Sequence, residues 1–390
     1  MTPAQPRRTI AAAGSEVAPD LVARDFRGPP EASGSSCPPV HFFDVLPLRR
    51  YACGAIAMGA TKHRDIVVEA GVGERAMNIA FGTSDGVWRL DKGKGGRIGL
   101  AGKVVSHVAD RSGTILAAAP RDGLYDISDT EHRIWEGDAR CCAIDPDGKL
   151  YVGIEPAMVF RSDDAGETWK RLDKIDELPT REQWYFPPPP HLPHVRSIDF
   201  LPNAERSVVV GVEVGGVLLS DDYGDNWREM NNGVHVDVHT VRPDPSQRGR
   251  LIAVTGGGLY VSEDNGESWK HITEGLGQGY AVGVHINPDR AGEVLVATGE
   301  RPPGLDARVY HSLDGGYSWN RIKESPLPER YDRVPVVLFA EGSAWIATDK
   351  GQIYRADDAS SSWSLVDQLP TTIHAASAGG SPSSISSGYR

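Results

Sequence analysis

Two histidines and two glutamates occupy recurring positions in successive segments of the chain. His194 and His235 each lie eight residues before a proline, and Glu155 and Glu213 each lie seven residues before a Ser-x-Asp sequence. Imidazole and carboxylate groups bind divalent metals, and they also exchange protons in acid–base catalysis. If the segments are copies of one structural unit, these side chains gather at one place in the fold.

The same alignments add further polar residues. Asp138 and Tyr280 align with the two histidines. Two residues after this aligned position, the segments have Arg140, Arg196 and Asp237. Those matching the glutamates are Thr255 and Asp349, with Glu300 close to the same position.

We assign roles to these residues as one hypothesis. The candidate ligands of a divalent metal ion, of unspecified identity, are His194, His235 and Glu213. The candidate catalytic and substrate-positioning residues are Glu155, Glu300, Tyr280 and Arg196. In the alternative interpretation these side chains only line a hydrated channel.

The elements that would position these residues are marked by a sequence repeat. The pattern Ser-x-Asp-x-Gly-x-x-Trp occurs over residues 162–169, 220–227, 262–269 and 312–319, and a degenerate copy spans 356–363. We call this the Ser-Asp-Gly-Trp repeat. Ser and Asp side chains hydrogen-bond to turn backbone, and Gly adopts positive φ. The pattern therefore predicts a hairpin turn, followed by a strand whose Trp packs between neighbouring sheets.

The pattern resembles the Asp-box (BNR) repeat of sialidases, sortilin-type receptors, some glycoside hydrolases and photosystem assembly factors. The resemblance implies a β-propeller in which the repeat joins the third and fourth strands of each blade, and it specifies a scaffold rather than a chemistry. The sialidase subgroup is disfavoured. The nearest match to its Arg-Ile-Pro sequence, Arg333-Val-Pro335, lies in the last blade instead of the first.

Strand patterns agree with a propeller of four-stranded antiparallel blades. Successive Trp residues of the repeat are 42 to 58 residues apart, which is one blade each. Two upstream units, at 75–100 and 103–137, lack the repeat but have strand patterns at a similar spacing. We therefore predict an all-β fold, a single propeller of seven blades, with six as the alternative. In such blades the start of the innermost strand and the end of the second strand lie opposite the repeat turns.

Domain boundaries follow from composition. Residues 1–36 and 375–390 are rich in small residues and proline, which predicts disordered ends around a propeller at 37–374. An insert at 173–193 contains Trp184-Tyr-Phe followed by four prolines. It is either a lid that shapes a pocket, or a cover that packs on a neighbouring loop.

Composition narrows the function classes. The formal charge is −12, without a long basic run, which argues against nucleic acid as a partner. No apolar segment is long enough to span a membrane. The apolar run at 10–13 is too short for a signal-peptide core, which predicts a cytoplasmic location. Cys37, Cys53, Cys141 and Cys142 lack metal-site spacing and are expected to be reduced thiols.

Three functions remain open. The first is an enzyme that acts on a small molecule or sugar at the channel mouth, as a metal-assisted hydrolase or lyase. The second is a scaffold without catalysis, whose insert at 173–193 contacts a partner protein. The third is a glycoside hydrolase, which needs two carboxylates at a defined separation.

Overall fold

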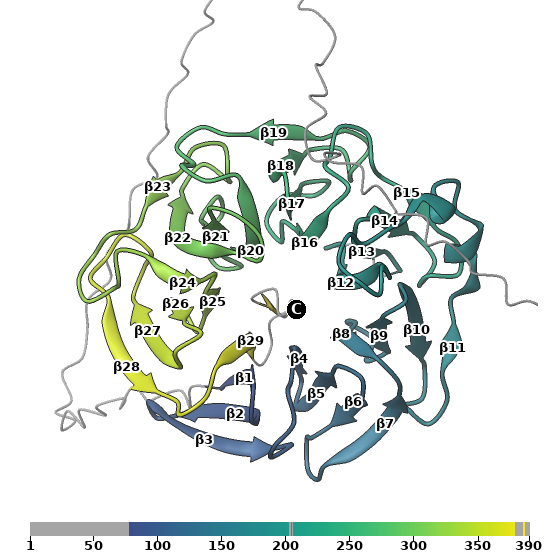
Figure 1. Ribbon diagram of the computed structural model, residues 1–390, viewed down its shortest axis with the longest axis horizontal. Helices are drawn as coiled ribbons and strands as arrows, with labels where there is room; N and C mark the ends of the chain where they lie inside the picture. The colour runs from purple at the N-terminus through teal and green to yellow at the C-terminus, as the bar shows by residue number, and fades with distance from the viewer. Residues whose placement is uncertain (1–77, 203, 205, 379–384, 387–390) are drawn as a thin grey trace, which may run out of the picture. The chain divides into compact units, whose positions relative to one another are not determined.

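The computed structural model describes residues 78–390, except 203, 205, 379–384 and 387–390. Its strands form seven antiparallel sheets arranged as a ring (Figure 1). The chain is therefore an all-β propeller with seven blades, as predicted, and the six-bladed alternative is excluded.

Each blade consists of four strands, ordered from the channel outward. Blade 1 contains β29 (Ile373–Ala378), β1 (Ile79–Thr83), β2 (Gly86–Asp91) and β3 (Lys94–Gly99), and blade 2 contains β4 (His107–Arg111), β5 (Thr114–Ala119), β6 (Gly123–Asp126) and β7 (His132–Glu136). Blade 3 contains β8 (Ala139–Ile144), β9 (Leu150–Ile154), β10 (Met158–Ser162) and β11 (Lys170–Arg171), and blade 4 contains β12 (His194–Phe200), β13 (Val208–Glu213), β14 (Gly216–Ser220) and β15 (Arg228–Glu229).

The remaining three blades follow the same order. Blade 5 contains β16 (Val238–Pro243), β17 (Leu251–Thr255), β18 (Gly258–Ser262) and β19 (Lys270–Ile272), and blade 6 contains β20 (Tyr280–Ile286), β21 (Val294–Gly299), β22 (Leu305–Ser312) and β23 (Asn320–Arg321). Blade 7 contains β25 (Val336–Ala340), β26 (Ser343–Ala347), β27 (Gln352–Ala356) and β28 (Ser364–Gln368). Two short strands lie outside this scheme: β24 (Tyr331–Arg333) pairs with β22, and β30 (Ile385–Ser386) pairs with β29.

The ring closes within blade 1. Its innermost strand, β29, comes from the C-terminal part of the chain and pairs antiparallel with β1, with Phe81 opposite Ala376. Pairing strands from the two ends of the propeller joins the last blade to the first. Each blade therefore packs between two neighbours, and the edges that remain are those of the short innermost and outermost strands.

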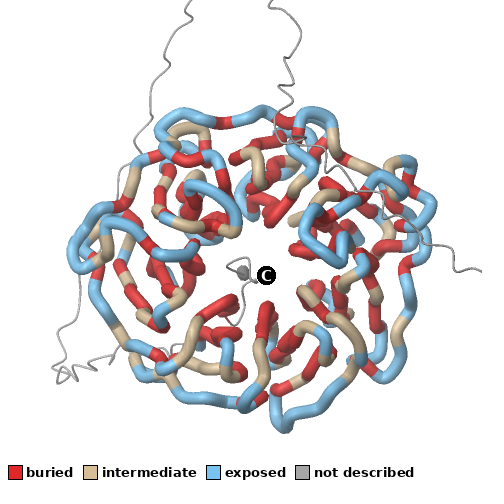
Figure 2. The backbone as a smooth tube through the Cα atoms, viewed as in Figure 1, coloured by how far each residue is buried: buried red, intermediate tan, exposed pale blue. Residues whose placement is uncertain are grey.

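Apolar residues hold neighbouring blades together. The inner strands are buried on both faces because each blade is packed between two others, whereas the outermost strands are exposed (Figure 2). Within the described residues, seven hydrophobic clusters fill the seven interfaces between blades. Strands such as Leu251–Thr255, with the sequence LIAVT, are near-continuously apolar for this reason.

The Ser-Asp-Gly-Trp repeats form the turns between the third and fourth strands of blades 3 to 6. In blade 3, Ser162 Oγ accepts the backbone N–H of Gly166 at 2.8 Å and donates to Asp164 Oδ1 at 2.7 Å. Gly166 has φ of 97°, which requires glycine. Trp169 donates from Nε1 to the carbonyl of Ile134 in the preceding blade. The repeat therefore shapes its own turn and attaches one blade to the next.

The described residues refine the predicted boundaries. The predicted disordered segment at 1–36, and residues 37–77 of the predicted propeller, lie outside the described part of the chain. Strand β29 continues to Ala378, beyond the expected end of the propeller at 374. The insert at 173–193 contains two 3-10 helices, η1 (Asp173–Glu177) and η2 (Arg181–Gln183). Neither has the length of a bilayer-spanning helix, and the described residues contain no other helix.

Candidate functional site

The innermost strands all start on the face opposite the repeat turns, which we call the strand-start face. In blade 4 the first residue of β12, His194, lies directly opposite the last residue of β13, Glu213. Glu155 follows the equivalent strand end in blade 3. The pairing of strands in a hairpin thus brings residues of both predicted sets to the same end of the blades.

His194 lies between two carboxylates from different blades. Its Nδ1 is 3.3 Å from Oε2 of Glu155, and its Nε2 is 3.0 Å from Oε2 of Glu213. The imidazole is 3% exposed. Arg140 in turn contacts Glu155 at 3.0 Å, which extends the polar network into blade 3. The structure therefore brings together Glu155, His194 and Glu213, as the sequence alignment predicted.

Arg196 supplies the countercharge of this network. Its Nη1 donates to Oε2 of Glu213 at 2.5 Å, and the Glu213 side chain is fully buried. Burial alone would raise the pKa of Glu213, but the Arg196 guanidinium and the His194 imidazole outweigh burial and hold that pKa well below its usual range. Glu213 is therefore a buried carboxylate that stays ionised.

Blade 5 has a different register from the one that the prolines suggested. Pro243 is the last residue of β16 and pairs with Leu251, whereas in blade 4 the residue at this position is Phe200, two residues before Pro202. Aligning on proline therefore shifts blade 5 by two residues. Asp237, rather than His235, is equivalent to His194.

The corrected register also assigns His239. The innermost strands of blades 3 to 6 contain a register shift after their first or second residue, which leaves Arg140, Arg196, His239 and Val282 at equivalent positions. His239 therefore occupies in blade 5 the position that Arg196 occupies in blade 4. The spacing from the Ser-Asp-Gly-Trp repeat does not reveal this position, because the loops between the strands differ in length from blade to blade.

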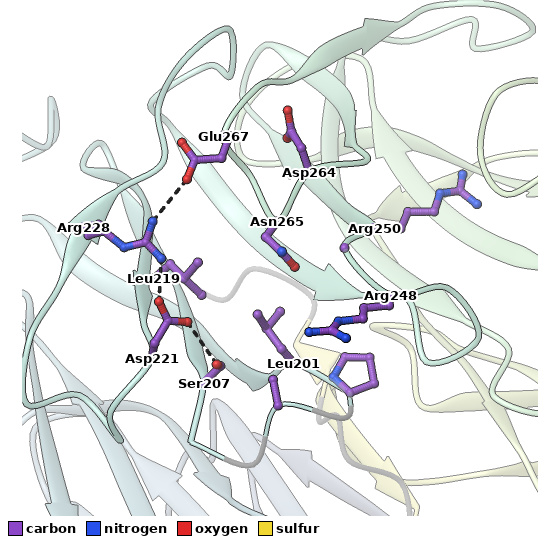
Figure 3. A pocket seen from close by; sticks show the side chains of 13 residues that line it. Leu201, Ser207, Leu219, Asp221, Arg228, Arg248, Arg250, Asp264, Asn265 and Glu267 are labelled. Carbon is purple, nitrogen blue, oxygen red and sulfur yellow. Dashed lines mark hydrogen bonds and ion pairs between the residues drawn. The ribbon is translucent and has the colours of Figure 1, made fainter.

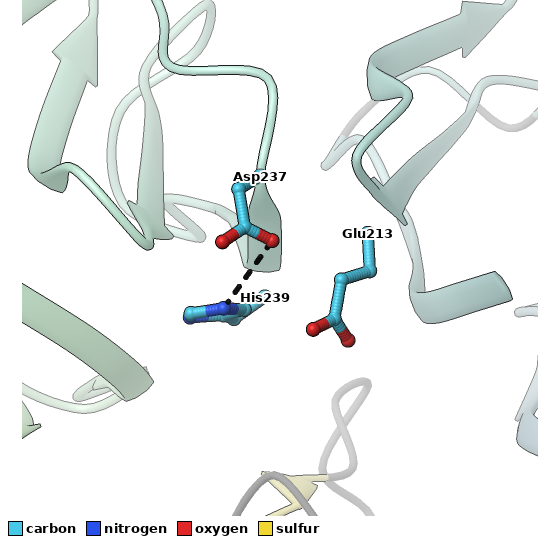
Figure 4. A group of neighbouring side chains, drawn as sticks. All are labelled: Glu213, Asp237 and His239. Carbon is cyan, nitrogen blue, oxygen red and sulfur yellow. Dashed lines mark ion pairs between the residues drawn. The ribbon is translucent and has the colours of Figure 1, made fainter. Parts of the chain in front are cut away.

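Glu213, Asp237 and His239 converge (Figure 4). One oxygen or nitrogen atom from each lies within 4.8 Å of the others, and among the described residues this is the group of three acidic, His or Cys side chains that meets this criterion. Asp237 comes from the loop before β16, His239 from β16 and Glu213 from the end of β13. The three predicted metal ligands His194, His235 and Glu213 do not form such a group.

The orientation of the His239 ring is fixed by its hydrogen bond. Nδ1 lies 2.6 Å from the carbonyl oxygen of Ala281, which can only accept, so Nδ1 carries the proton. Burial, together with the nearby Arg196, lowers the pKa of His239 and favours the neutral ring. Nε2 then presents a lone pair, and Asp237 Oδ1 lies 3.6 Å from it. A lone pair and a carboxylate repel each other unless a cation or proton donor lies between them.

The other predicted residues lie around this group or apart from it. Tyr280 packs on His239, with ring centroids 4.8 Å apart. His235 is exposed and lies over the Gly256-Gly257 turn, where a Cβ added to Gly257 would be 2.6 Å from its ring. Glu300 is exposed and follows the end of β21. Among the predicted catalytic residues, Glu155, Arg196 and Tyr280 are thus at the candidate site.

The insert covers part of the strand-start face. Trp184 is buried in the cluster between blades 3 and 4. Phe186 contacts His194 edge-on, with ring centroids 5.4 Å apart. Tyr185 points outward, is 54% exposed and stacks on His191. The insert therefore packs on the blades and also covers His194.

A cavity of about 280 Å³ lies on the opposite side, between blades 4 and 5 (Figure 3). Its wall includes Asp264 of a repeat turn and the side chain of Arg228. Arg228 contacts Asp221 at 2.6 Å and Glu267 at 3.1 Å, both in the same wall. With Arg248 and Arg250, the three arginines of the wall balance the carboxylates of Asp221, Asp264 and Glu267, so we place the candidate site on the strand-start face.

Comparisons with known proteins support the fold. No family model matches the chain, and no curated protein matches its sequence. Among solved structures, a GH74 xyloglucanase from Xanthomonas campestris is 18% identical, with a TM-score of 0.52 over 75% of this chain and 46% of the enzyme. The extracellular domain of a hybrid two-component system from B. thetaiotaomicron is 15% identical, with a TM-score of 0.52 over 70% of this chain and 36% of that chain.

A third similar structure is YCF48 bound to D1 peptide, at 14% identity and a TM-score of 0.49 over 73% of this chain and 92% of that one. This chain spans less than half the length of the xyloglucanase and of the two-component domain. At such identities the likeness to the xyloglucanase and to the two-component domain shows the propeller fold alone.

Proposed function

We propose that the strand-start face binds a divalent cation through Glu213, Asp237 and His239 and acts on a small polar molecule at the channel mouth, as a metal-assisted hydrolase or lyase. The observation that carries this proposal is the orientation of His239. Its Nδ1 is committed to a backbone carbonyl, and its Nε2 faces a carboxylate oxygen at 3.6 Å. This is the arrangement in which metal-binding histidines are held.

The residues present fit a cation in number and charge. Two carboxylates and one neutral imidazole are a common ligand set for divalent metals. Arg196 offsets one of the two negative charges, so the group keeps a net charge of about −1 when His239 is neutral. A carboxylate has about four lone-pair positions, so Glu213 can contact Arg196, His194 and a cation together.

The surrounding residues have distinct roles. A bound cation would polarise a carbonyl or lower the pKa of a water molecule. His194 holds Glu213 from one side, and with Glu155 it forms a path for a proton away from the site. The Asp237 side chain is 23% exposed and is the ligand that faces solvent, so the substrate would approach past it.

The test is a thermal unfolding and calorimetric titration with Mn²⁺, Zn²⁺ and Ca²⁺. A cation at 100 times its Kd stabilises the folded state by about 2.7 kcal/mol. We expect such stabilisation in the natural chain and its loss in Asp237→Asn and His239→Gln, because each variant removes one ligand. His235→Gln is the matched control and should bind the cation unchanged.

Two outcomes contradict the proposal. If none of the three cations binds, the group of Glu213, Asp237 and His239 is not a cation site. If His235→Gln abolishes binding while Asp237→Asn keeps it, the cation lies with His194 and His235 instead. The products formed from small esters, lactones and glycosides by the cation-loaded protein then distinguish the two enzyme classes, because a hydrolase adds water across the cleaved bond and a lyase leaves a double bond.

A binding function without catalysis is the second candidate, and the exposed Tyr185 favours it. Tyr185 and His191 present a stacked aromatic surface on the insert, at the strand-start face. Aromatic side chains of this kind are enriched in protein interfaces. A glycoside hydrolase is less well supported, because the His194 ring fills the space between Glu155 and Glu213, where such a pair would hold a sugar.

A further inference from the structure

A short C-terminal strand lies inside the central channel. β30 pairs antiparallel with β29, with Ser386 opposite Ala375 and Ile385 opposite Ala376. Its Cα atoms also lie within 8 Å of β4, β20 and β25. The short yellow arrow inside the ring in Figure 1 shows this strand beside β29. Four blades, including both neighbours of the closing blade, therefore surround residues 385–386.

The sequence of β29 explains why a further strand fits at this place. Two residues after the register shift, where β29 has Ala376, the innermost strands of blades 4, 5 and 6 have the larger residues Ile198, Val241 and Val284. β29 reads IHAASA, so the residues after His374 are all alanine or serine. Small side chains let another backbone approach closely. The unpaired edge of an innermost strand offers N–H and C=O groups that an extended segment can bind.

The paired positions are level with the candidate site. His374 lies at the register shift of blade 1, as Arg196 and His239 lie at the shifts of blades 4 and 5. Ala375 and Ala376 are the next two residues. β30 therefore runs alongside β29 at the two residues that follow the level of Arg196 and His239, toward the repeat turns.

We propose that the channel edge of β29 is a binding edge for an extended peptide, and that residues 385–386 of this chain are its occupant. Backbone pairing holds the segment against β29. The small residues of β29 make this strand, rather than another innermost strand, the partner of the segment. The pairing requires no cation at Glu213, Asp237 and His239.

The test uses the full chain with Ile385→Pro and Ser386→Pro combined, because proline has no N–H to donate to the ladder. Hydrogen exchange of residues 373–378, followed by mass spectrometry, should be at least tenfold faster in this variant for the amides that face the channel. A labelled synthetic peptide of residues 379–390 should bind the variant at least tenfold more tightly than the natural chain, whose edge is occupied.

The control is Ser383→Pro with Ser384→Pro, which adds two prolines outside the paired positions and should leave exchange unchanged. Equal exchange in the natural chain and the Ile385→Pro, Ser386→Pro variant would overturn the proposal. So would peptide binding of equal strength to both chains, or a labelled peptide that binds neither. If an unrelated extended peptide binds the variant as well as residues 379–390 do, the edge lacks selectivity and the assigned occupant is wrong.

Discussion

Carboxylates occur at both ends of the blades, but they are held in different ways. On the turn side, Asp164 accepts hydrogen bonds from Ser162 and from Thr168, all within one repeat. On the strand-start face, Glu213 is held by Arg196 of the neighbouring strand and by His194, which also reaches Glu155 of another blade. Local, repeated contacts build the turns of the scaffold, whereas the contacts of Glu155, His194, Arg196 and Glu213 join separate strands and blades and mark the site.

The largest expected effect is on the strand-start face. Replacing Arg196 by Met removes the positive charge closest to the Glu213 carboxylate, which stays buried. Removing one partner of a buried ion pair costs about 3–5 kcal/mol. We expect Arg196→Met to lower the free energy of unfolding by that amount, as measured by urea denaturation at pH 7.

Two variants sharpen this comparison. Arg196→Met combined with Glu213→Met leaves no unpaired charge and should recover most of the loss. Arg228→Met breaks an exposed pair on the turn side and should cost about 0–1 kcal/mol. Equal losses in Arg196→Met and Arg228→Met would show that the two ends of the blades do not differ as described.

The second effect concerns the repeat turns. Ser312 is buried and accepts the N–H groups of Gly316 and Asp314 at 2.7 and 3.3 Å. Ser312→Ala leaves a buried N–H without its acceptor, and we expect a loss of about 1–3 kcal/mol in the free energy of unfolding. Ser318→Ala, which removes a more exposed hydroxyl of the same turn, should cost less than half of that. A smaller loss for Ser312→Ala than for Ser318→Ala would contradict the role of the buried Ser.

This contrast explains what could be predicted from the sequence. The repeat turns need Ser, Asp and Gly at fixed spacing because these groups bond within their own turn, so the pattern and its degenerate copy predicted five blades, and the strand patterns upstream predicted the other two. His194, Glu155 and Glu213 could be placed because in both blades 3 and 4 a proline lies two residues after the innermost strand, and three residues join the last paired residues of the second and third strands.

Blade 5 could not be placed in this way. The loop between β17 and β18 is one residue shorter than its counterpart in blade 4, and Pro243 is the last residue of β16 instead of following the strand. Neither change alters the hydrophobic pattern, since a shift of two residues keeps every side chain on its face. The position of β30 depends on pairing within the channel, for which the low-complexity sequence of residues 379–390 gives no periodic signal.

The third effect tests the corrected register with two neighbouring glycines. A Cβ added to Gly256 would lie 2.2 Å from Oδ2 of Asp237, so Gly256→Ala displaces the carboxylate. We expect Mn²⁺ affinity to fall about tenfold, equivalent to about 1.4 kcal/mol, as measured by calorimetric titration. Gly257→Ala instead contacts the exposed His235 ring, which can move, and should leave the affinity unchanged. The reverse result would favour His235 as the ligand over Asp237.

The smallest effect is the pH dependence of a repeat turn. Burial opposes ionisation of Asp314, but hydrogen bonds from Ser318, Ser312 and turn backbone outweigh it and lower its pKa to about 2. Because the folded pKa lies below the ordinary value of 3.8, ionised Asp314 stabilises the fold above about pH 4, and this contribution is lost as the pH falls toward 2. The difference in unfolding free energy between the natural chain and Asp314→Asn should therefore be constant from pH 7 to 5 and shrink between pH 4 and 2, in urea denaturation series. Glu324→Gln, in the exposed loop after blade 6, controls for the loss of one charge. A difference that stays constant down to pH 2 would mean that the charge of Asp314 does not contribute to the stability of the turn. The two ends of the blades would then differ in burial alone.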